Sequence, residues 1–444
     1  MQTLNPLDPS RVDAPRPTRV RYMVLGYLAV MAFILYLDRV CIAQALSPIQ
    51  TEFGLTNKQT SYILMAFTLA YGLFEIPTGH WGDRYGSRRI LTRIVMWWSG
   101  FTVLTAACVG FYSLVAVRFL FGAGEAGAFP NAARVISKWF PARERGQVQG
   151  LFQAASLIGG AVSPTIAGFL IERSGWRTPF VLFGILGVVW GVAFYFWFRD
   201  EPHEHPAVNA AEAELLEPNR LATGAAADHQ LPWREILTHP TIWLLGTITS
   251  CASFNSYLYF SWYSKYLQAA RGVGQFESGR MSSLVLTGGV IGTILGGVLV
   301  DRWVRRFANT VPPRRLLASS GMALGAGLVW LSFHSDSPWL AVSLACLSCI
   351  ALFTQQTVWW SCATEVAGRY IGALFGLMNG LGVFGAMSSQ YVVGAIADHR
   401  AAQGFTGRDQ WDPIFYVFIG VLLFGSFCWL WVDPRRTVGV KREA

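Results

Sequence analysis

The chain has 444 residues, of which 53% are hydrophobic and 14% are charged, and its net charge is +9. Soluble proteins are about 25% charged, so this composition excludes a disordered, coiled-coil, collagen-like or soluble α/β architecture. The basic residues stand at the ends of apolar segments, which favours topology signals and anionic-lipid contacts over nucleic-acid binding. We therefore predict an all-α polytopic protein of the lipid bilayer. A β-barrel does not fit, because the apolar segments are long and continuous.

Twelve apolar segments are each close to the roughly 20 residues that a bilayer requires. We predict spanning helices at 22–43, 60–79, 90–110, 112–132, 146–171, 178–198, 241–264, 281–300, 316–334, 338–361, 371–397 and 412–432. A signal peptide is the alternative for the first segment. The eleven further segments and the charged pair Asp38-Arg39 argue against that alternative.

One long polar insert divides the twelve segments into two bundles of six. We expect a tail at 1–21, an N-terminal bundle at 22–198, a linker at 199–238, a C-terminal bundle at 239–433 and a tail at 434–444. The linker is rich in Ala, Pro and acidic residues, so we interpret it as a solvated segment with one surface helix at 208–217. Its histidines fit a solvated loop better than a metal site.

Lys and Arg gather in the two tails and in the loops on the same side of the predicted membrane. This asymmetry predicts that both termini are cytoplasmic. Arg, Ala and Gly are abundant and Lys is scarce, which favours a bacterial source. We therefore expect a multi-pass protein of the bacterial inner membrane.

One motif occurs at equivalent positions in both halves. The second predicted span is followed by Gly79-His-Trp-Gly-Asp83-Arg84-Tyr-Gly86-Ser-Arg88-Arg89, and the eighth by Gly297-Val-Leu-Val-Asp301-Arg302. Recurrence at half the chain length is typical of an internally duplicated transporter. We interpret the Asp as an acceptor for N–H groups and the Arg cluster as part of a cytoplasmic gate. The candidate gate residues are Gly79, Asp83, Arg84, Gly86, Arg88, Asp301 and Arg302.

With this motif, residues 20–435 resemble the major facilitator superfamily, which implies two six-helix halves that rock around a central site. Three further segments are similar to the anion:cation symporter family: Tyr36-Leu-Asp38-Arg39, Arg118-Phe-Leu-Phe-Gly-Ala-Gly-Glu125-Ala-Gly-Ala-Phe-Pro130 and Trp139-Phe-Pro141-Ala-Arg143. That family includes carriers of hexuronates, glucarate, galactonate, phthalate and sulfonates. The resemblance implies proton-coupled symport of a small organic anion by a monomer without a cofactor. Ser156 stands where sugar-acid carriers share a Gln, which leaves smaller anions open beside sugar acids.

Charges inside predicted spans cost from about 2.5 kcal/mol upward each and are functional by default. The first span holds Asp38 and Arg39, and the fourth holds Arg118 and Glu125. Positions 118, 122, 125 and 129 share one helical face, and the glycines at 122 and 124 leave room for a substrate or a neighbouring helix. Sequence neighbours point about 100° apart on a helix. We therefore expect Arg39 to face the central cavity and Asp38 to reach Arg118.

These residue types suit anion binding coupled to protons. Arg39 keeps its charge and can grip a carboxylate with two parallel hydrogen bonds. Burial favours the neutral form of a carboxylate and a nearby Arg favours the ionised form, so substrate arrival can change protonation. We hypothesise that Asp38, Glu125 and Arg118 couple protons to transport. A fixed ion-pair network between the first and fourth spans is the structural alternative.

The second half is almost free of intramembrane charge and offers amide and aromatic groups. The resemblance implies substrate contacts for Trp360 and Asn379, and we add Gln356 and Tyr71 as candidates. Helix–helix packing is the alternative for all four. Glu75 lies near a predicted span end, and we interpret it as structural.

The sequence also limits the other functions. It contains no H-E-x-x-H, no G-x-S-x-G and no His/Cys cluster, so we predict neither an enzyme nor a metal site. A nutrient receptor that does not transport, and an exporter or antiporter of the same superfamily, stay open as alternatives. Binding without flux would distinguish the receptor.

Overall fold

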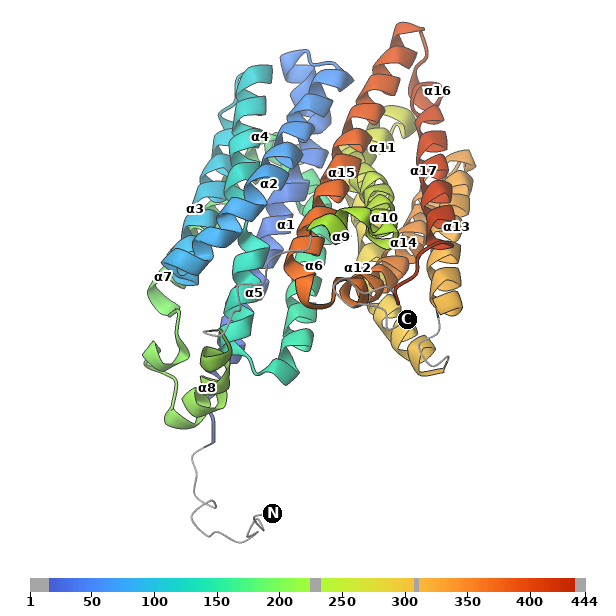
Figure 1. The fold of residues 1–444 in the computed structure, drawn as a ribbon. Coiled ribbons are helices and arrows are strands. Elements are labelled where there is room, and N and C mark those ends of the chain that lie inside the picture. Colours follow the sequence, from blue (N-terminus) through green and yellow to red (C-terminus); the bar gives the residue numbers. More distant parts are fainter. Residues whose placement is uncertain (1–15, 224–232, 307–310, 436–444) are drawn as a thin grey trace.

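The computed structural model describes residues 16–223, 233–306 and 311–435, and within these ranges all regular elements are helices (Figure 1). The N-terminal bundle contains α1 (Val20–Phe53), α2 (Asn57–Tyr85), α3 (Ser87–Ala106), α4 (Phe111–Glu125), α5 (Ala128–Trp139), α6 (Ala142–Ser174) and α7 (Arg177–Trp197). The segment between the bundles contains the 3-10 turn Pro202–Glu204, α8 (Ala210–Thr223) and α9 (Trp233–Thr238).

The C-terminal bundle has a matching set of helices. It contains α10 (Pro240–Tyr257), a π-helical turn at Leu258–Trp262, α11 (Tyr263–Arg271), α12 (Gln275–Arg306), α13 (Val311–His334), α14 (Pro338–Ala367), the 3-10 turn Gly368–Tyr370, α15 (Ile371–Ala402), α16 (Gly407–Trp411) and α17 (Pro413–Trp429). Each predicted span coincides with one helix or a run of consecutive helices. Among the described residues, eight helices are long and apolar enough to cross a membrane. The predicted all-α fold with two six-helix bundles is confirmed.

The fourth predicted span is interrupted rather than continuous. α4 ends at Glu125, Ala126 is extended (φ −56°, ψ 140°), and Gly127 has a φ of +85°. Pro130 lacks an N–H group and its ring would clash with the carbonyl four residues earlier, which disfavours a continuous helix at residue 126. Gly127 is required because a Cβ there would lie 2.7 Å from the Thr78 Cβ of α2. The break leaves Glu125 as the last residue of its helix.

Glycines bring helices of the same half into close contact. In α12, a Cβ at Gly288, Gly292 or Gly296 would press on the backbone of α14. In α6, Gly159 packs on the Phe33 carbonyl of α1 in the same way. One turn further along α6, the Ser163 hydroxyl donates to the Leu37 carbonyl at 2.6 Å. The close contact of α6 with α1 fixes the position of α1, which carries Asp38 and Arg39.

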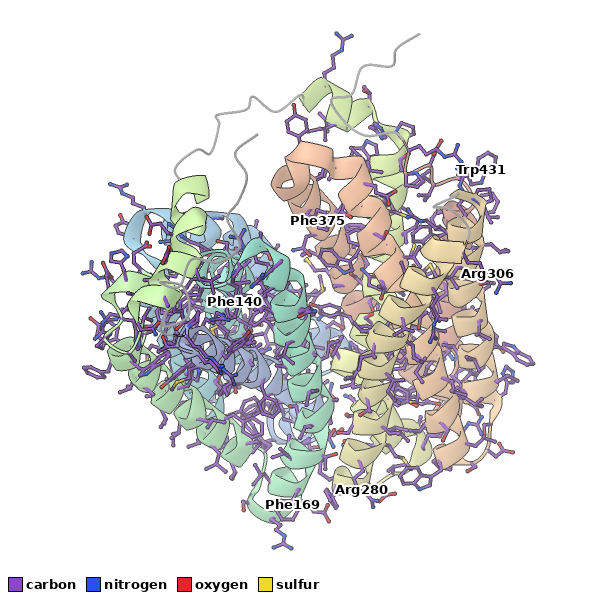
Figure 2. The ribbon with its side chains drawn as sticks, turned by 90° about the horizontal axis from the view of Figure 1, so that it is seen from below. Phe140, Phe169, Arg280, Arg306, Phe375 and Trp431 are labelled. Carbon is purple, nitrogen blue, oxygen red and sulfur yellow. The ribbon has the colours of Figure 1, made fainter. Side chains whose placement is uncertain are left out.

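The two halves meet along α6 with α12 and along α2 with α15. The start of α1, α8 and the end of α17 lie toward one end of the molecule, which we call the terminal end (Figure 1). The hydrogen bonds between described residues of the two halves gather toward the other end, for example Thr165 with Ser283 (2.7 Å) and the Asn57 N–H with Asp398 (3.0 Å). Seen from below, the two bundles stand side by side (Figure 2). The halves are therefore joined at the end opposite the termini.

The start of the linker is folded against the N-terminal half, which corrects the expectation of a solvated segment. Glu212 of α8 is fully buried and accepts hydrogen bonds from the backbone N–H groups of Val20 (3.2 Å) and Arg21 (3.3 Å). Its carboxylate also pairs with the Arg21 guanidinium at 2.9 Å. A carboxylate suits this position because the first N–H groups of α1 have no partner within the helix.

A second linker residue is buried as well. His205 is 3% exposed and lies edge-on to Trp139 and Trp197. Its Nδ1 accepts from the Ala207 N–H at 3.2 Å. Burial lowers the pKa of His205, with a further contribution from Arg199. The folded helix reaches Thr223, beyond the predicted end at residue 217.

Candidate functional site

Arg39 and Glu125 form an ion pair between α1 and the end of α4. The Arg39 Nε donates to Glu125 Oε1 at 2.8 Å, and its second terminal nitrogen donates to the same oxygen. The Glu125 side chain is 1% exposed and that of Arg39 is 15% exposed. The other carboxylate oxygen of Glu125 has no hydrogen-bond partner among the described residues. The remaining terminal nitrogen of Arg39 has no hydrogen-bond partner among the described residues, on a cation that presents fixed parallel donors.

Aromatic rings surround the Arg39 guanidinium. Its central carbon lies 4.9 Å from the ring centre of Tyr36, 5.3 Å from that of Phe67 and 4.7 Å from that of Tyr71. Such faces attract a cation within about 6 Å. Tyr71 was predicted from the sequence to contact substrate, and the structure places it directly beside Arg39. Tyr36 and Phe67 are additions from the structure.

Asp38 and Arg118 are buried behind this pair, at 1% and 2% exposure. Asp38 lies close to Arg118 and to the Trp98 and Thr102 side chains of α3. Neither Asp38 oxygen has a hydrogen-bond partner among the described residues, and these residues show no ion pair for Asp38 within 4 Å. The expectation that Asp38 reaches Arg118 is met in position but not in contact. Instead, the Arg118 guanidinium lies over the Phe121 ring at 4.4 Å.

The glycines of α4 hold neighbouring helices rather than a ligand. A Cβ at Gly122 would strike the Phe67 carbonyl of α2, and one at Gly124 would overlap the Trp97 ring of α3. The break after Glu125 also separates Phe129 from the face shared by residues 118, 122 and 125. Phe129 lies on α5, where its ring is 6.3 Å from that of Tyr36. Of the two occupants that the sequence allowed beside these glycines, the neighbouring helix is the correct one.

The candidates of the second half lie on α14 and α15. Trp360 is 51% exposed and stacks on Phe375, with the ring centres 4.9 Å apart. Gln356 is half-buried one turn earlier on the same helix face. Asn379 is exposed and donates a hydrogen bond to Glu75 of the other half. Asn379 is thus brought to the N-terminal half, whereas the Trp360 ring contacts Trp359 and Phe375 of its own half.

Glu75 is the residue that sequence reasoning missed. It follows Tyr71 by one turn of α2, is half-buried, and lies close enough to Arg39 for electrostatic interaction. Tyr257 of α10 also lies within electrostatic range of Arg39. The available signal was the i, i+4 spacing of Tyr71 and Glu75, which places both on one face of the helix.

The gate motif is described in part. Gly86 has a φ of +81°, and a Cβ there would lie 2.6 Å from the Asp200 carboxylate at the end of the N-terminal bundle. The Arg88 N–H donates to that carboxylate at 2.9 Å, and its guanidinium donates to the Tyr195 carbonyl at 2.7 Å. Arg84 and Arg302 are exposed. The side-chain placements at Gly79, Asp83 and Asp301 lie outside the described residues.

Comparison with known proteins identifies the family to which this architecture belongs. The model of the Major Facilitator Superfamily matches residues 28–390. A protein of Cupriavidus necator named "Probable sulfoacetate transporter" is 32% identical over 427 residues, which cover 96% of each chain. A Bacillus subtilis protein named "Probable galactarate/D-glucarate transporter" is 28% identical over 98% of this chain and 96% of its own.

Solved structures show the same fold. A bacterial homologue of the human lysosomal transporter Spinster, in an inward-facing unoccupied conformation, superimposes with a TM-score of 0.78 at 19% identity, over 95% of this chain and 98% of its own. The family and the relatives are transporters rather than enzymes. From the family match, the extent of the relatives and the two-bundle fold together, the chain is a multi-pass membrane transporter that belongs to the major facilitator superfamily.

Proposed function

We propose that this transporter carries out proton-coupled symport of a small organic anion by alternating access. The observation that carries the proposal is the buried pair of Arg39 and Glu125, in which a fixed cation is bound by a carboxylate that can take up a proton. An arriving carboxylate or sulfonate binds the remaining terminal nitrogen of Arg39 and displaces Glu125. A buried carboxylate without its counter-ion is destabilised by several kcal/mol, so Glu125 takes up a proton as it is released.

Asp38 and Arg118 complete the coupling group. Both are buried next to the pair, and neither has an ion-pair partner within 4 Å among the described residues. The proton is the coupling ion, and no other cofactor is required.

The substrate class follows from the cation and from the relatives. The names of the two relatives specify sulfoacetate for one and galactarate or D-glucarate for the other. Both kinds of molecule carry a planar carboxylate or a sulfonate, which the fork of an Arg recognises. Trp360, Asn379, Gln356 and Tyr71 would then recognise the shape and hydroxyl groups of the bound anion.

The direction of opening follows from charge and contacts. Lys and Arg are concentrated at the terminal end, which the positive-inside rule assigns to the cytoplasm. The halves are joined at the other end, so the described state is open toward the cytoplasm. The motif residues from Gly79 to Arg88, with Asp301 and Arg302, would form the cytoplasmic gate when the site opens outward. We place the protein in a bacterial inner membrane as a monomer.

The test is uptake by the purified protein in proteoliposomes. Galactonate, glucarate, galacturonate, phthalate and sulfoacetate are offered with and without an inward proton gradient. We expect gradient-dependent accumulation of at least one acid by the wild type and its loss in Arg39→Ala. Arg280→Ala is the matched control, because Arg280 is an exposed Arg at the end opposite the termini, where among the described residues it pairs with Glu277 and lies over the Trp339 ring. Specific binding without flux would indicate a receptor, and no response to any anion would contradict the role of Arg39.

A further inference from the structure

Glu75 is a carboxylate that faces the candidate site from the seam between the halves. This seam runs antiparallel along α2 and α15, from Asn57 and Asp398 at its outer end to Glu75 and Asn379 at its inner end. The Glu75 carboxylate accepts its hydrogen bond from the Asn379 side chain, which is a neutral donor. At the outer end, the Asp398 carboxylate accepts hydrogen bonds across this seam from the N–H groups of Asn57 and Lys58. Glu75 is therefore the acid of the seam that lies beside the substrate site.

The charges around Arg39 show what Glu75 adds. Arg39 is paired with Glu125, whereas the buried Arg118 and Asp38 behind them have no ion pair within 4 Å among the described residues. Glu75 is a further carboxyl group of this site, and it lies within electrostatic range of Arg39 and close to the Tyr71 hydroxyl. The site thus presents a cation at one position and an additional anion nearby.

A substrate that binds Arg39 with its acidic group extends toward this additional charge. If its far end carries a hydroxyl or an ammonium group, that group can donate a hydrogen bond to Glu75, and hydrogen bonds to an ionised acceptor are the stronger kind. If its far end carries a second carboxylate, two like charges come together beside the half-buried Glu75. Like charges brought together in this way oppose binding strongly.

We propose that Glu75 is a specificity-determining residue that selects monoanions with a hydrogen-bond donor at the far end over dianions. The substrate class is then hydroxy acids, hydroxysulfonates or aminosulfonates. The inference rests on the proposed function, because it assumes that an organic anion binds at Arg39. It goes beyond the two relatives, whose names specify the dianions sulfoacetate and galactarate or D-glucarate.

Two matched substrate pairs test the selection by charge alone. D-Galactonate differs from galactarate, and isethionate from sulfoacetate, only in carrying a terminal CH₂OH in place of a carboxylate. The ratio of kcat/KM values for uptake is measured within each pair at fixed pH and fixed proton gradient. A change in stability or in the number of active carriers affects both members of a pair equally, so the ratio reports recognition.

Wild type is expected to prefer the monoanion in each pair that it transports. Glu75→Gln keeps an oxygen acceptor for Asn379 but removes the charge, and it is expected to reduce the preference about tenfold or more. Glu75→Asp is expected to retain the preference. Asp398→Asn is the control, because it removes a carboxylate from the same seam at the end remote from the site. Glu75→Ala is a second charge-removing variant in case Glu75→Gln does not reconstitute.

The outcomes separate this inference from the proposed function. Loss of the preference in Glu75→Gln, with retention in Glu75→Asp and Asp398→Asn, supports the inference. Unchanged ratios in both charge-removing variants, or a wild-type preference for the dianions, would overturn it while leaving anion transport intact. If wild type neither transports nor binds any of the four acids, the proposed function fails and this inference fails with it.

Discussion

Arg39 donates both of its hydrogen bonds to a single oxygen of Glu125. This contact allows the pair to be stable without substrate and still exchange partners when an anion arrives. Among the described residues, neither the second Glu125 oxygen nor the remaining terminal nitrogen of Arg39 has a hydrogen-bond partner. An incoming anion can therefore form its first hydrogen bonds before the old ones break. The exchange of partners needs no unpaired buried charge, which would cost several kcal/mol.

Replacing Glu125 by Gln separates binding from coupling. Glu125→Gln keeps a hydrogen-bond acceptor for Arg39 but cannot bind or release a proton in the cycle. We expect substrate counterflow between equal pools to persist, whereas accumulation driven by a proton gradient falls to the level of protein-free liposomes. The measurement is radiolabelled counterflow beside gradient-driven uptake in one preparation. Accumulation by Glu125→Gln would remove this residue from the coupling mechanism.

At the scale of the helix, some features were predictable from the sequence and others were not. The spans could be predicted because each needs only about 20 apolar residues in a row. The break after Glu125 could have been found from Pro130 and Gly127 together, since the proline disfavours a continuous helix and the glycine permits the turn. The docking of α8 could not, because the buried role of Glu212 depends on α1, more than 190 residues away.

Two adjacent glycines of α12 provide a test of helix packing. A Cβ at Gly296 would lie 2.9 Å from the Thr354 carbonyl of α14, whereas one at Gly297 would have nothing within 4 Å. We expect Gly296→Ala to reduce the free energy of unfolding by about 1–3 kcal/mol. Gly297→Ala should leave it unchanged or raise it by up to about 1 kcal/mol through helix propensity.

The measurement is the apparent melting temperature of each variant in the same detergent. Gly296→Ala must melt below Gly297→Ala. Equal melting temperatures would show that α12 and α14 do not pack as closely as the glycine spacing requires.

At the scale of the whole molecule, the function depends on how the halves meet, and the sequence contains little information on this. Glu75 was interpreted as structural because it lies near a predicted span end, and its partner Asn379, 304 positions away on the other half, could not be inferred. The first-half residues Asp38, Arg39, Arg118 and Glu125 were accessible to sequence reasoning, because charges inside apolar spans are rare. Their pairing was not, since Arg39 and Asp38 both lie near α4 and only the packing decides which of them contacts Glu125.

The outer end of the seam is held by Asp398. Its carboxylate accepts from the Asn57 N–H (3.0 Å), the Asn57 side chain (2.8 Å) and the Lys58 N–H (2.8 Å), at the N-terminus of α2. A negative charge is favourable at this position. Asp398→Asn should weaken closure of this end by about 1.5–3 kcal/mol, which favours the outward-open state at least about tenfold.

Spin labels on Thr51→Cys and Ala402→Cys can measure this shift, since both positions are exposed at the joined ends of α1 and α15. The native cysteines are buried and should label little. We expect Asp398→Asn to add a longer distance to the distribution. Asp336→Asn is the control, because Asp336 is an exposed acid that pairs with Arg408 within one half. An unchanged distribution in Asp398→Asn would exclude Asp398 as a determinant of closure.

The contact between Glu212 and the start of α1 has a practical consequence for dividing the protein. A fragment that ends at residue 198 would leave the first N–H groups of α1 without their carboxylate and would expose Trp139 and Trp197, which now enclose His205. A fragment that ends after Thr223 carries α8 with it and keeps these groups covered. For coexpression of two separate half-molecules, the cut therefore belongs after residue 223 rather than at the end of the last membrane helix of the first half.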